Sequence, residues 1–220
     1  MKIVLEPDQR LFFTSDTHYN HKNICRSTTE WRTKDKEIPI SQTRDFKSLH
    51  HMNSVIVNNI NEVVKQDDIL FHLGDWSFGG FEYVKEFRDR IVCNNVHLLY
   101  GNHDHHIEKN REGIRGIFTT TSQYLVLTVV ENDMTHEFVL MHYPLCSWHN
   151  MNNGRFHLFG HVHLPENKKR MAGRSMDVGM DGNNMMPYDM REVVRTLSGR
   201  PVQSNRLPHD HHEERLENSK

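Results

Sequence analysis

The chain of 220 residues has few cysteines, no long hydrophobic run and almost no excess of either charge. Its three cysteines, Cys25, Cys93 and Cys146, are odd in number and form no CxxC pair, which argues against a disulfide framework and a thiolate zinc site. No apolar run reaches membrane length, and residues 1–7 lack the apolar core of a signal peptide. We therefore expect a cytoplasmic protein with reduced thiols and no membrane partner.

The charge balance bears on the kind of partner. Lys and Arg total 27 against 29 Asp and Glu, so no basic field covers the whole molecule to hold extended nucleic acid. A local basic groove stays open, but a small anionic substrate held by a few local charges fits this balance better. The oligomeric state is left open.

Histidine is unusually abundant, with 18 residues. Several of them lie in the polar segment 208–214, which has no apolar periodicity and to which we assign no specific function. We predict a single domain over residues 1–199, followed by a polar and flexible tail over 200–220. A hydrophobic content of 36% suits one such domain.

Hydrophobic spacing predicts alternating strands and helices. Apolar residues three and four apart predict a helix within 41–65, and helices are also expected over 79–92 and 189–197. Strands are expected over 3–5, 11–14, 69–75, 96–100, 123–130, 136–142, 157–163 and 175–180. The order predicts an α/β fold, more closely an α+β sandwich, in which two packed mixed β-sheets are flanked by helices.

Several predicted strands stop abruptly at polar residues, in the segments 12–18, 69–75, 98–104 and 158–163, and another ends at His142. Strand ends are where open α/β folds keep their sites. The candidate ligands gathered there are Asp16, His18, Asp75, Asn102, His142, His161 and His163. Seven oxygen and nitrogen ligands exceed the need of one tetrahedral ion and suit two divalent ions that share a carboxylate. Such a pair favours in-line attack on phosphorus, so the pattern predicts phosphate ester hydrolysis.

The ordered motifs resemble those of the calcineurin-like metallophosphoesterases. The matching blocks are Asp16-x-His18, Gly74-Asp75, Gly101-Asn102-His103-Asp104, His142 and Gly160-His161-x-His163. Segments 18–23 and 177–181 are similar to a small, single-domain bacterial and phage branch of that superfamily. The resemblance implies that Asp16, His18, Asp75 and His163 bind one ion, that Asp75, Asn102, His142 and His161 bind the other, and that Asp75 bridges the two.

The resemblance also implies the catalytic roles. His103 would protonate the leaving alkoxide, Asp104 would hold the His103 imidazole in position, and a hydroxide between the two ions would be the nucleophile. Manganese is the first choice of metal, and iron, zinc and nickel suit the same ligands.

Several alternatives stay open at this point. A small phosphodiester, such as a cyclic nucleotide or a nucleotide end, is the favoured substrate, and a phosphomonoester or a noncatalytic metal-binding scaffold are the other interpretations. Serine/threonine protein phosphatases of the superfamily carry Arg soon after the Gly-Asp block, where this chain has Trp76-Ser77-Phe78-Gly79, so that activity is disfavoured. The loop over 26–40 is the candidate for substrate selection.

Overall fold

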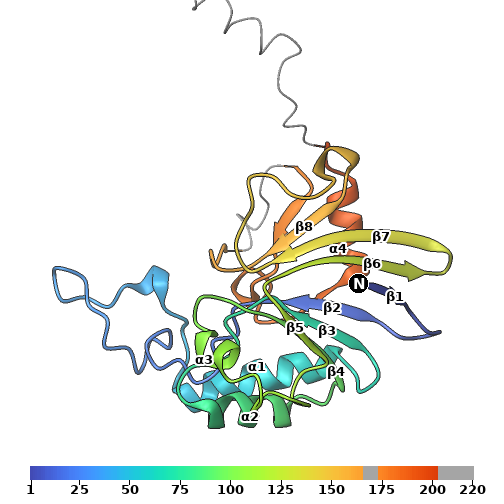
Figure 1. The fold of residues 1–220 in the computed structure, drawn as a ribbon. Coiled ribbons are helices and arrows are strands. Elements are labelled where there is room, and N and C mark those ends of the chain that lie inside the picture. The colour runs from blue at the N-terminus through green and yellow to red at the C-terminus, as the bar shows by residue number, and fades with distance from the viewer. Residues whose placement is uncertain (166–172, 203–220) are drawn as a thin grey trace, which may run out of the picture.

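The fold is described by a computed structural model covering residues 1–165 and 173–202 (Figure 1). The histidines of segment 208–214, and all of the predicted tail beyond residue 202, lie outside the described residues. Two five-stranded mixed sheets form the centre of the molecule, as the sequence predicts. No helix in the described ranges is long and apolar enough to cross a membrane.

The first sheet has the strand order β10-β2-β3-β4-β5. Its strands are β2 (Leu11–Thr14), β3 (Ile69–His72), β4 (Asn95–Leu99), β5 (Thr120–Ser122) and β10 (Tyr188–Asp189). β2, β3, β4 and β5 run parallel, while β10 pairs antiparallel with β2. The carboxyl ends of β2, β3 and β4 therefore lie side by side at one edge of this sheet.

The second sheet has the order β1-β6-β7-β8-β9. Its strands are β1 (Lys2–Val4), β6 (Tyr124–Glu131), β7 (Met134–Met141), β8 (Phe156–Phe159) and β9 (Ser175–Asp177). β6 and β7, which correspond to the predicted strands 123–130 and 136–142, form a hairpin that turns through Asn132 and Asp133, both with positive φ. β7, β8 and β9 are parallel, so their carboxyl ends also share one edge.

Alternation along the central strands builds two separate cores. Phe12 of β2 and Leu70 of β3 pack against α1 (Leu49–Val63) and α2 (Phe81–Arg90), which cover the outer face of the first sheet (Figure 1). Phe13 and Phe71, which point to the opposite face, pack against the second sheet and α4 (Met190–Ser198). Both faces of β2 and β3 are thus buried, which accounts for their unbroken apolar sequences.

The sequence did not predict three features of the fold. β1 and β2, which lie close together in the sequence, enter different sheets, because β1 pairs in parallel with β6. β8 and β9 are shorter than the predicted strands 157–163 and 175–180, since the chain leaves the extended conformation at the polar residues. The short elements α3 (His105–Lys109), β5 and β10 carry too few apolar residues for a periodic pattern to reveal them.

Candidate metal centre

The candidate ligands come from loops that leave the two sheets at one common edge. Backbone hydrogen bonds tie the loop after β2 to the loop after β3, with Asp16 N–H donating to the Gly74 carbonyl at 2.9 Å and His18 N–H to the Asp75 carbonyl at 3.0 Å. In the second sheet, Gly160 N–H donates to the His142 carbonyl at 2.9 Å. A β-bridge from Ser15 to Gly179 joins the two sheets beside these loops.

Left-handed backbone conformations concentrate at the candidate ligands. Five of the seven have φ between 48° and 73°, a region that residues other than glycine rarely adopt: Asp16, His18, Asp75, His161 and His163. These residues lie in the loops that follow β2, β3 and β8, two to four positions beyond the last residue of the strand. Backbone strain of this kind is typical of functional sites, where the surrounding structure holds it in place.

Two glycines allow the loops after β3 and β4 to approach each other closely. A Cβ on Gly74, whose φ is +102°, would lie 2.5 Å from the Gly101 nitrogen, and a Cβ on Gly101 would lie 2.3 Å from Asp75 Oδ1. Both separations are far below a van der Waals contact. Each Gly therefore serves to bring a polar loop against the other, and this explains why Gly precedes Asp75 and Asn102.

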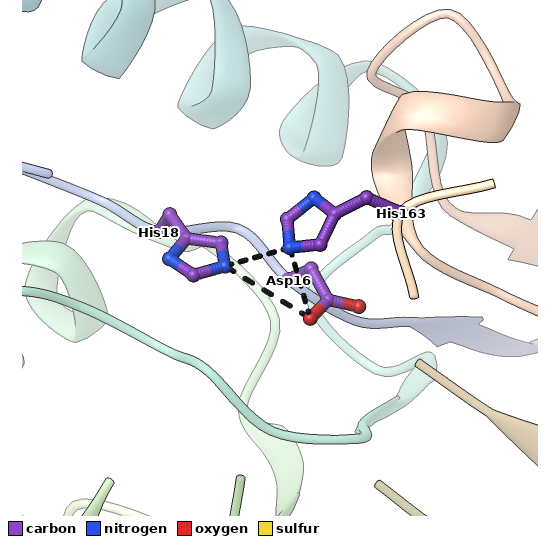
Figure 2. Close-up of side chains that lie close together, drawn as sticks. All are labelled: Asp16, His18 and His163. Carbon is purple, nitrogen blue, oxygen red and sulfur yellow. Dashed lines mark hydrogen bonds and ion pairs between the residues drawn. The ribbon is translucent and has the colours of Figure 1, made fainter. Parts of the chain in front are cut away.

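One group of candidate ligands consists of Asp16, His18 and His163 (Figure 2). The Nε2 atoms of the two histidines are 3.1 Å apart, and Asp16 Oδ1 lies 3.9 Å from His18 Nε2 and 3.6 Å from His163 Nε2. Figure 2 shows the two rings with these nitrogens turned toward each other above the carboxylate. Lone pairs that converge in this way fit a cation between them.

An ion pair between the buried Arg44 and the partly buried Asp181 orients one of these rings. His163 Nδ1 lies 2.7 Å from Asp181 Oδ2, so this nitrogen donates its proton to the carboxylate and the Nε2 lone pair faces His18. Arg44, which is buried, donates to both Asp181 oxygens at 2.8 and 2.7 Å. The same guanidinium donates to the carbonyls of Thr17 at 2.9 Å and Asp16 at 2.6 Å. Arg44 and Asp181 thus fix both the loop that carries Asp16 and the ring of His163.

A second group joins Asp16 and Asp75 to His142. His142 Nδ1 is 2.8 Å from the Leu73 carbonyl, which fixes the proton on that nitrogen and leaves Nε2 as a ligand atom. His142 Nε2 lies 3.0 Å from Asn102 Oδ1, and His161 Nδ1 lies 2.8 Å from the same oxygen. Asn102 therefore sits between the two rings, and all seven candidate ligands lie in one continuous cluster.

Asp75 occupies the position between the two groups. Its Oδ2 atom is 3.5 Å from His18 Nε2 on one side and 3.6 Å from His142 Nε2 on the other. A single carboxylate oxygen between histidines of different groups has the placement expected of a ligand shared by two ions.

Burial sets the electrostatics of this cluster. It raises the pKa of Asp16 to about 7 and the pKa of Asp75 to about 7, in the latter case reinforced by the neighbouring Asp16 carboxylate. Burial lowers the pKa of His18 well below its usual value. Carboxylates that are costly to ionise, beside imidazoles that stay neutral, are stabilised by a bound cation. The residues present therefore fit divalent metal ions.

Burial lowers the pKa of His163 as well, but its hydrogen bond to Asp181 and the charges of Asp16 and Asp181 outweigh that effect, and the net pKa is raised. For Asp181, burial opposes ionisation, whereas the Arg44 charge and the hydrogen bonds from Arg44 and His163 hold the pKa well below its ordinary value. Asp181 is consequently an anion that can balance charge next to the cluster.

His103 and Asp104 differ in their surroundings. The His103 ring is partly exposed beside the cluster, with its centroid 5.6 Å from that of His18 and 4.6 Å from that of Phe78. Burial lowers its pKa. The backbone N–H of His103 donates to Asp75 Oδ1 at 2.9 Å, which fixes the backbone of His103 relative to the Asp75 carboxylate.

The expectation that Asp104 positions the His103 imidazole requires a correction. Asp104 is fully buried, and its carboxylate accepts hydrogen bonds from three backbone N–H groups, those of Asp75 at 2.7 Å, Trp76 at 3.0 Å and Gly101 at 2.8 Å. Its oxygens are therefore directed at the backbone of the loops after β3 and β4. Through these contacts Asp104 positions the loop that carries Asp75, and not the imidazole of His103.

Sequence reasoning missed Arg44, and it noted Asp181 only within a segment of family resemblance. Arg44 lies 28 residues after Asp16, and 137 residues separate it from Asp181. The one available signal was a charged residue, Arg44, near the start of the range 41–65 predicted to hold a helix, and a charge at such a position ordinarily indicates exposure to solvent. Only the packing of the loop against the cluster shows that this guanidinium is buried.

This chain is similar to several known proteins but matches no family model. An uncharacterized protein of Methanocaldococcus jannaschii is 26% identical over 198 residues, which cover 86% of this chain and 92% of that protein.

Two solved structures are similar. A protein of unknown function from Aquifex aeolicus has a TM-score of 0.61 at 22% identity, covering 86% of this chain and 100% of that one. An archaeal phosphodiesterase has a TM-score of 0.41 at 15% identity, covering 83% of this chain and 99% of that one. The likeness to the Aquifex aeolicus protein shows a shared fold alone.

Proposed function

We propose that this protein is a hydrolase, a metal-dependent phosphoesterase that acts on small phosphate esters, with phosphodiesters as the favoured class. The observation that carries the proposal is the placement of Asp75 Oδ2, within 3.6 Å of the Nε2 atoms of both His18 and His142. This geometry supports two adjacent ions that share one ligand, and such pairs are typical of phosphate ester hydrolysis. The ordered motifs, which resemble those of calcineurin-like metallophosphoesterases, agree with it.

The ligands divide into two sets around Asp75. Asp16, His18 and His163 would hold one ion with Asp75, while Asn102, His142 and His161 would hold the other. When bound, two divalent ions would activate water and neutralise charge on the phosphoryl oxygens, and manganese is the metal that we would supply first.

The residues of the chain itself position the ester and move the proton. His103 lies at the partly exposed side of the cluster, where its ring can reach the oxygen of a departing alcohol and donate a proton to it. Asp104 keeps the loops of Asp75 and Asn102 together through its three backbone contacts. Arg44 and Asp181 keep the His163 ring turned toward the cluster.

Metal removal tests the proposal directly. We expect protein stripped with a chelator to lose hydrolysis of bis-p-nitrophenyl phosphate, and to regain it on addition of manganese, because the cluster cannot neutralise the phosphoryl charge alone. Metal content would be measured in parallel, and p-nitrophenyl phosphate would show whether a monoester is preferred. Full activity in protein that retains no metal, or no hydrolysis of either compound with both ions bound, would contradict the proposal.

The His103→Ala variant tests the role of the partly exposed histidine. We expect it to retain its metal and to lose about 100-fold in kcat on methyl phenyl phosphate, whose leaving group needs a proton. On methyl p-nitrophenyl phosphate the loss should stay below about tenfold, because p-nitrophenolate departs without protonation. His105→Ala, at an exposed position two residues further, is the matched control. Equal losses on the two esters would rule out the proton-donor role.

A further inference from the structure

A cavity of about 810 Å³ opens beside the metal centre, and several of its lining residues belong to the segment between β2 and α1. That segment projects from the sheets in blue (Figure 1). His18, His103 and His163 are among the residues that line the cavity. Ligand sites for drug-sized molecules span roughly 300–1,000 Å³, so this space exceeds what a phosphate group alone requires. The cavity is therefore large enough for the organic part of an ester whose phosphate lies at the cluster.

The outer part of the cavity carries an exposed aromatic side chain. Trp31 is 37% exposed, whereas Trp76 and Trp148 are 0% and 8% exposed. The Trp31 ring meets the His21 ring edge-on at a centroid distance of 5.8 Å. His21 in turn stacks on Phe78 at 3.4 Å with an interplanar angle of 7°, so the surface that supports Trp31 is itself packed.

Hydrogen bonds hold the segment that presents Trp31. Its base is closed by a β-bridge between Cys25 and Arg44, with Arg44 N–H donating to the Ile24 carbonyl. The Trp31 N–H donates to Thr29 Oγ1 at 3.1 Å, and the Trp31 carbonyl accepts from the Arg32 guanidinium at 2.6 Å. The backbone of Trp31 is thus held by local hydrogen bonds, and the base of its segment pairs with Arg44, whose guanidinium orders the metal centre.

The remaining lining combines apolar and hydrogen-bonding groups. Ile24, Val162 and Pro165 contribute apolar surface, and Asn23, Ser41 and Gln42 contribute amides and a hydroxyl. An alkyl chain would leave these polar groups unpaired. A flat heterocycle with hydrogen-bonding edges suits both the apolar and the polar groups, since bases stack on aromatic side chains and bond through their edges.

We propose that this cavity binds the nucleoside part of a phosphate ester, with the base stacked on Trp31 and the phosphate at the metal centre. The proposal rests on the proposed function and narrows its substrates to nucleotides. His103 lines the same cavity, so the nucleoside occupies the side on which the alcohol leaves.

The test compares two ligands that differ only in the base. Adenosine 5′-monophosphate and ribose 5-phosphate would be titrated by calorimetry into manganese-loaded wild-type protein, Trp31→Ala and Trp31→Phe. We expect the wild-type protein to bind the nucleotide about tenfold to 100-fold more tightly, because of stacking on the base. The ratio should fall below about threefold in Trp31→Ala and persist in Trp31→Phe, which keeps an aromatic ring. Metal content and ribose 5-phosphate affinity should be the same in all three proteins.

Equal affinity of the wild-type protein for the two ligands would overturn the nucleoside site, as would an unchanged ratio in Trp31→Ala or no binding of either ligand. This binding experiment involves no turnover, so its failure differs from that of the phosphoesterase proposal, which is measured by hydrolysis of bis-p-nitrophenyl phosphate. Hydrolysis of bis-p-nitrophenyl phosphate without tighter binding of the nucleotide would support the phosphoesterase activity and contradict the nucleoside site.

Discussion

Replacing Asp75 with Asn is expected to abolish most activity and to weaken both metal sites together. Asp75 Oδ2 lies between His18 and His142, so the substitution removes a negative charge that both ions would share. Mutation of a residue that only hydrogen-bonds to a metal ligand typically lowers metal affinity by about 10-fold to 100-fold. Loss of a ligand that both ions share should lower the affinity by more. We expect kcat/KM to fall by about 100-fold or more. Calorimetric titration with manganese would show weakened binding at both sites.

The fold should survive this substitution. Burial raises the pKa of Asp75 to about 7, so an ionised carboxylate is unfavourable at this position in the metal-free protein, and a neutral amide of the same shape removes that penalty. Asp68→Asn is the matched control, because Asp68 is also buried and accepts backbone hydrogen bonds, from Arg10 and Lys65 at 2.8 Å, away from the cluster. Loss of one ion with full retention of the other in Asp75→Asn would contradict the shared ligand.

The second large effect is expected at Asp181. In Asp181→Asn the His163 Nδ1 proton loses its carboxylate partner, and the ring is no longer held with Nε2 toward Asp16 and His18. We expect the affinity of one manganese site to fall by about 10-fold to 100-fold, the range found for carboxylates behind a histidine ligand, while the other site changes little. This one-site loss contrasts with the two-site loss expected in Asp75→Asn.

Asp181→Asn also removes the negative charge that pairs with the buried Arg44, so the stability of this variant must be measured separately. Removing one partner of a buried ion pair is generally destabilising. Glu131→Gln provides the comparison, since Glu131 is buried and accepts from Arg191 Nε at 2.8 Å in a pair that touches no candidate ligand. Both variants should lose stability in urea, but only Asp181→Asn should lose manganese affinity. An unchanged manganese affinity in Asp181→Asn would contradict the proposal that Asp181 positions His163.

The predictions made from local pattern agree with the structure where the pattern was strong. The apolar spacing of residues 49–63 predicts α1, and β2 and β4 match the predicted strands within one residue. β3 begins at the predicted residue and ends three residues earlier than predicted. These elements bury enough apolar surface for sequence alone to specify them. β5 and β10 were missed, because their pairing depends on a neighbouring strand rather than on their own composition.

The candidate ligands were found because each follows a strand, and parallel strands place their ends at one edge. Local sequence thus predicted which residues could gather there. It could not predict the orientation of their side chains, which follows from left-handed backbone conformations at Asp16, His18, Asp75, His161 and His163. It also misplaced Asp104, whose carboxylate turns to three backbone N–H groups instead of the neighbouring imidazole.

The sequence by itself determined the class of the fold and the identity of the polar residues at the strand ends, because both are properties of short segments. Only the tertiary structure decided which oxygen lies between the two histidine groups, and which ion pair orients His163. Arg44, Asp181 and Trp31 reach the site from segments far apart in the chain, and their roles depend on burial and contact. Distances between such segments are set by the packing of the two sheets, which no local pattern encodes.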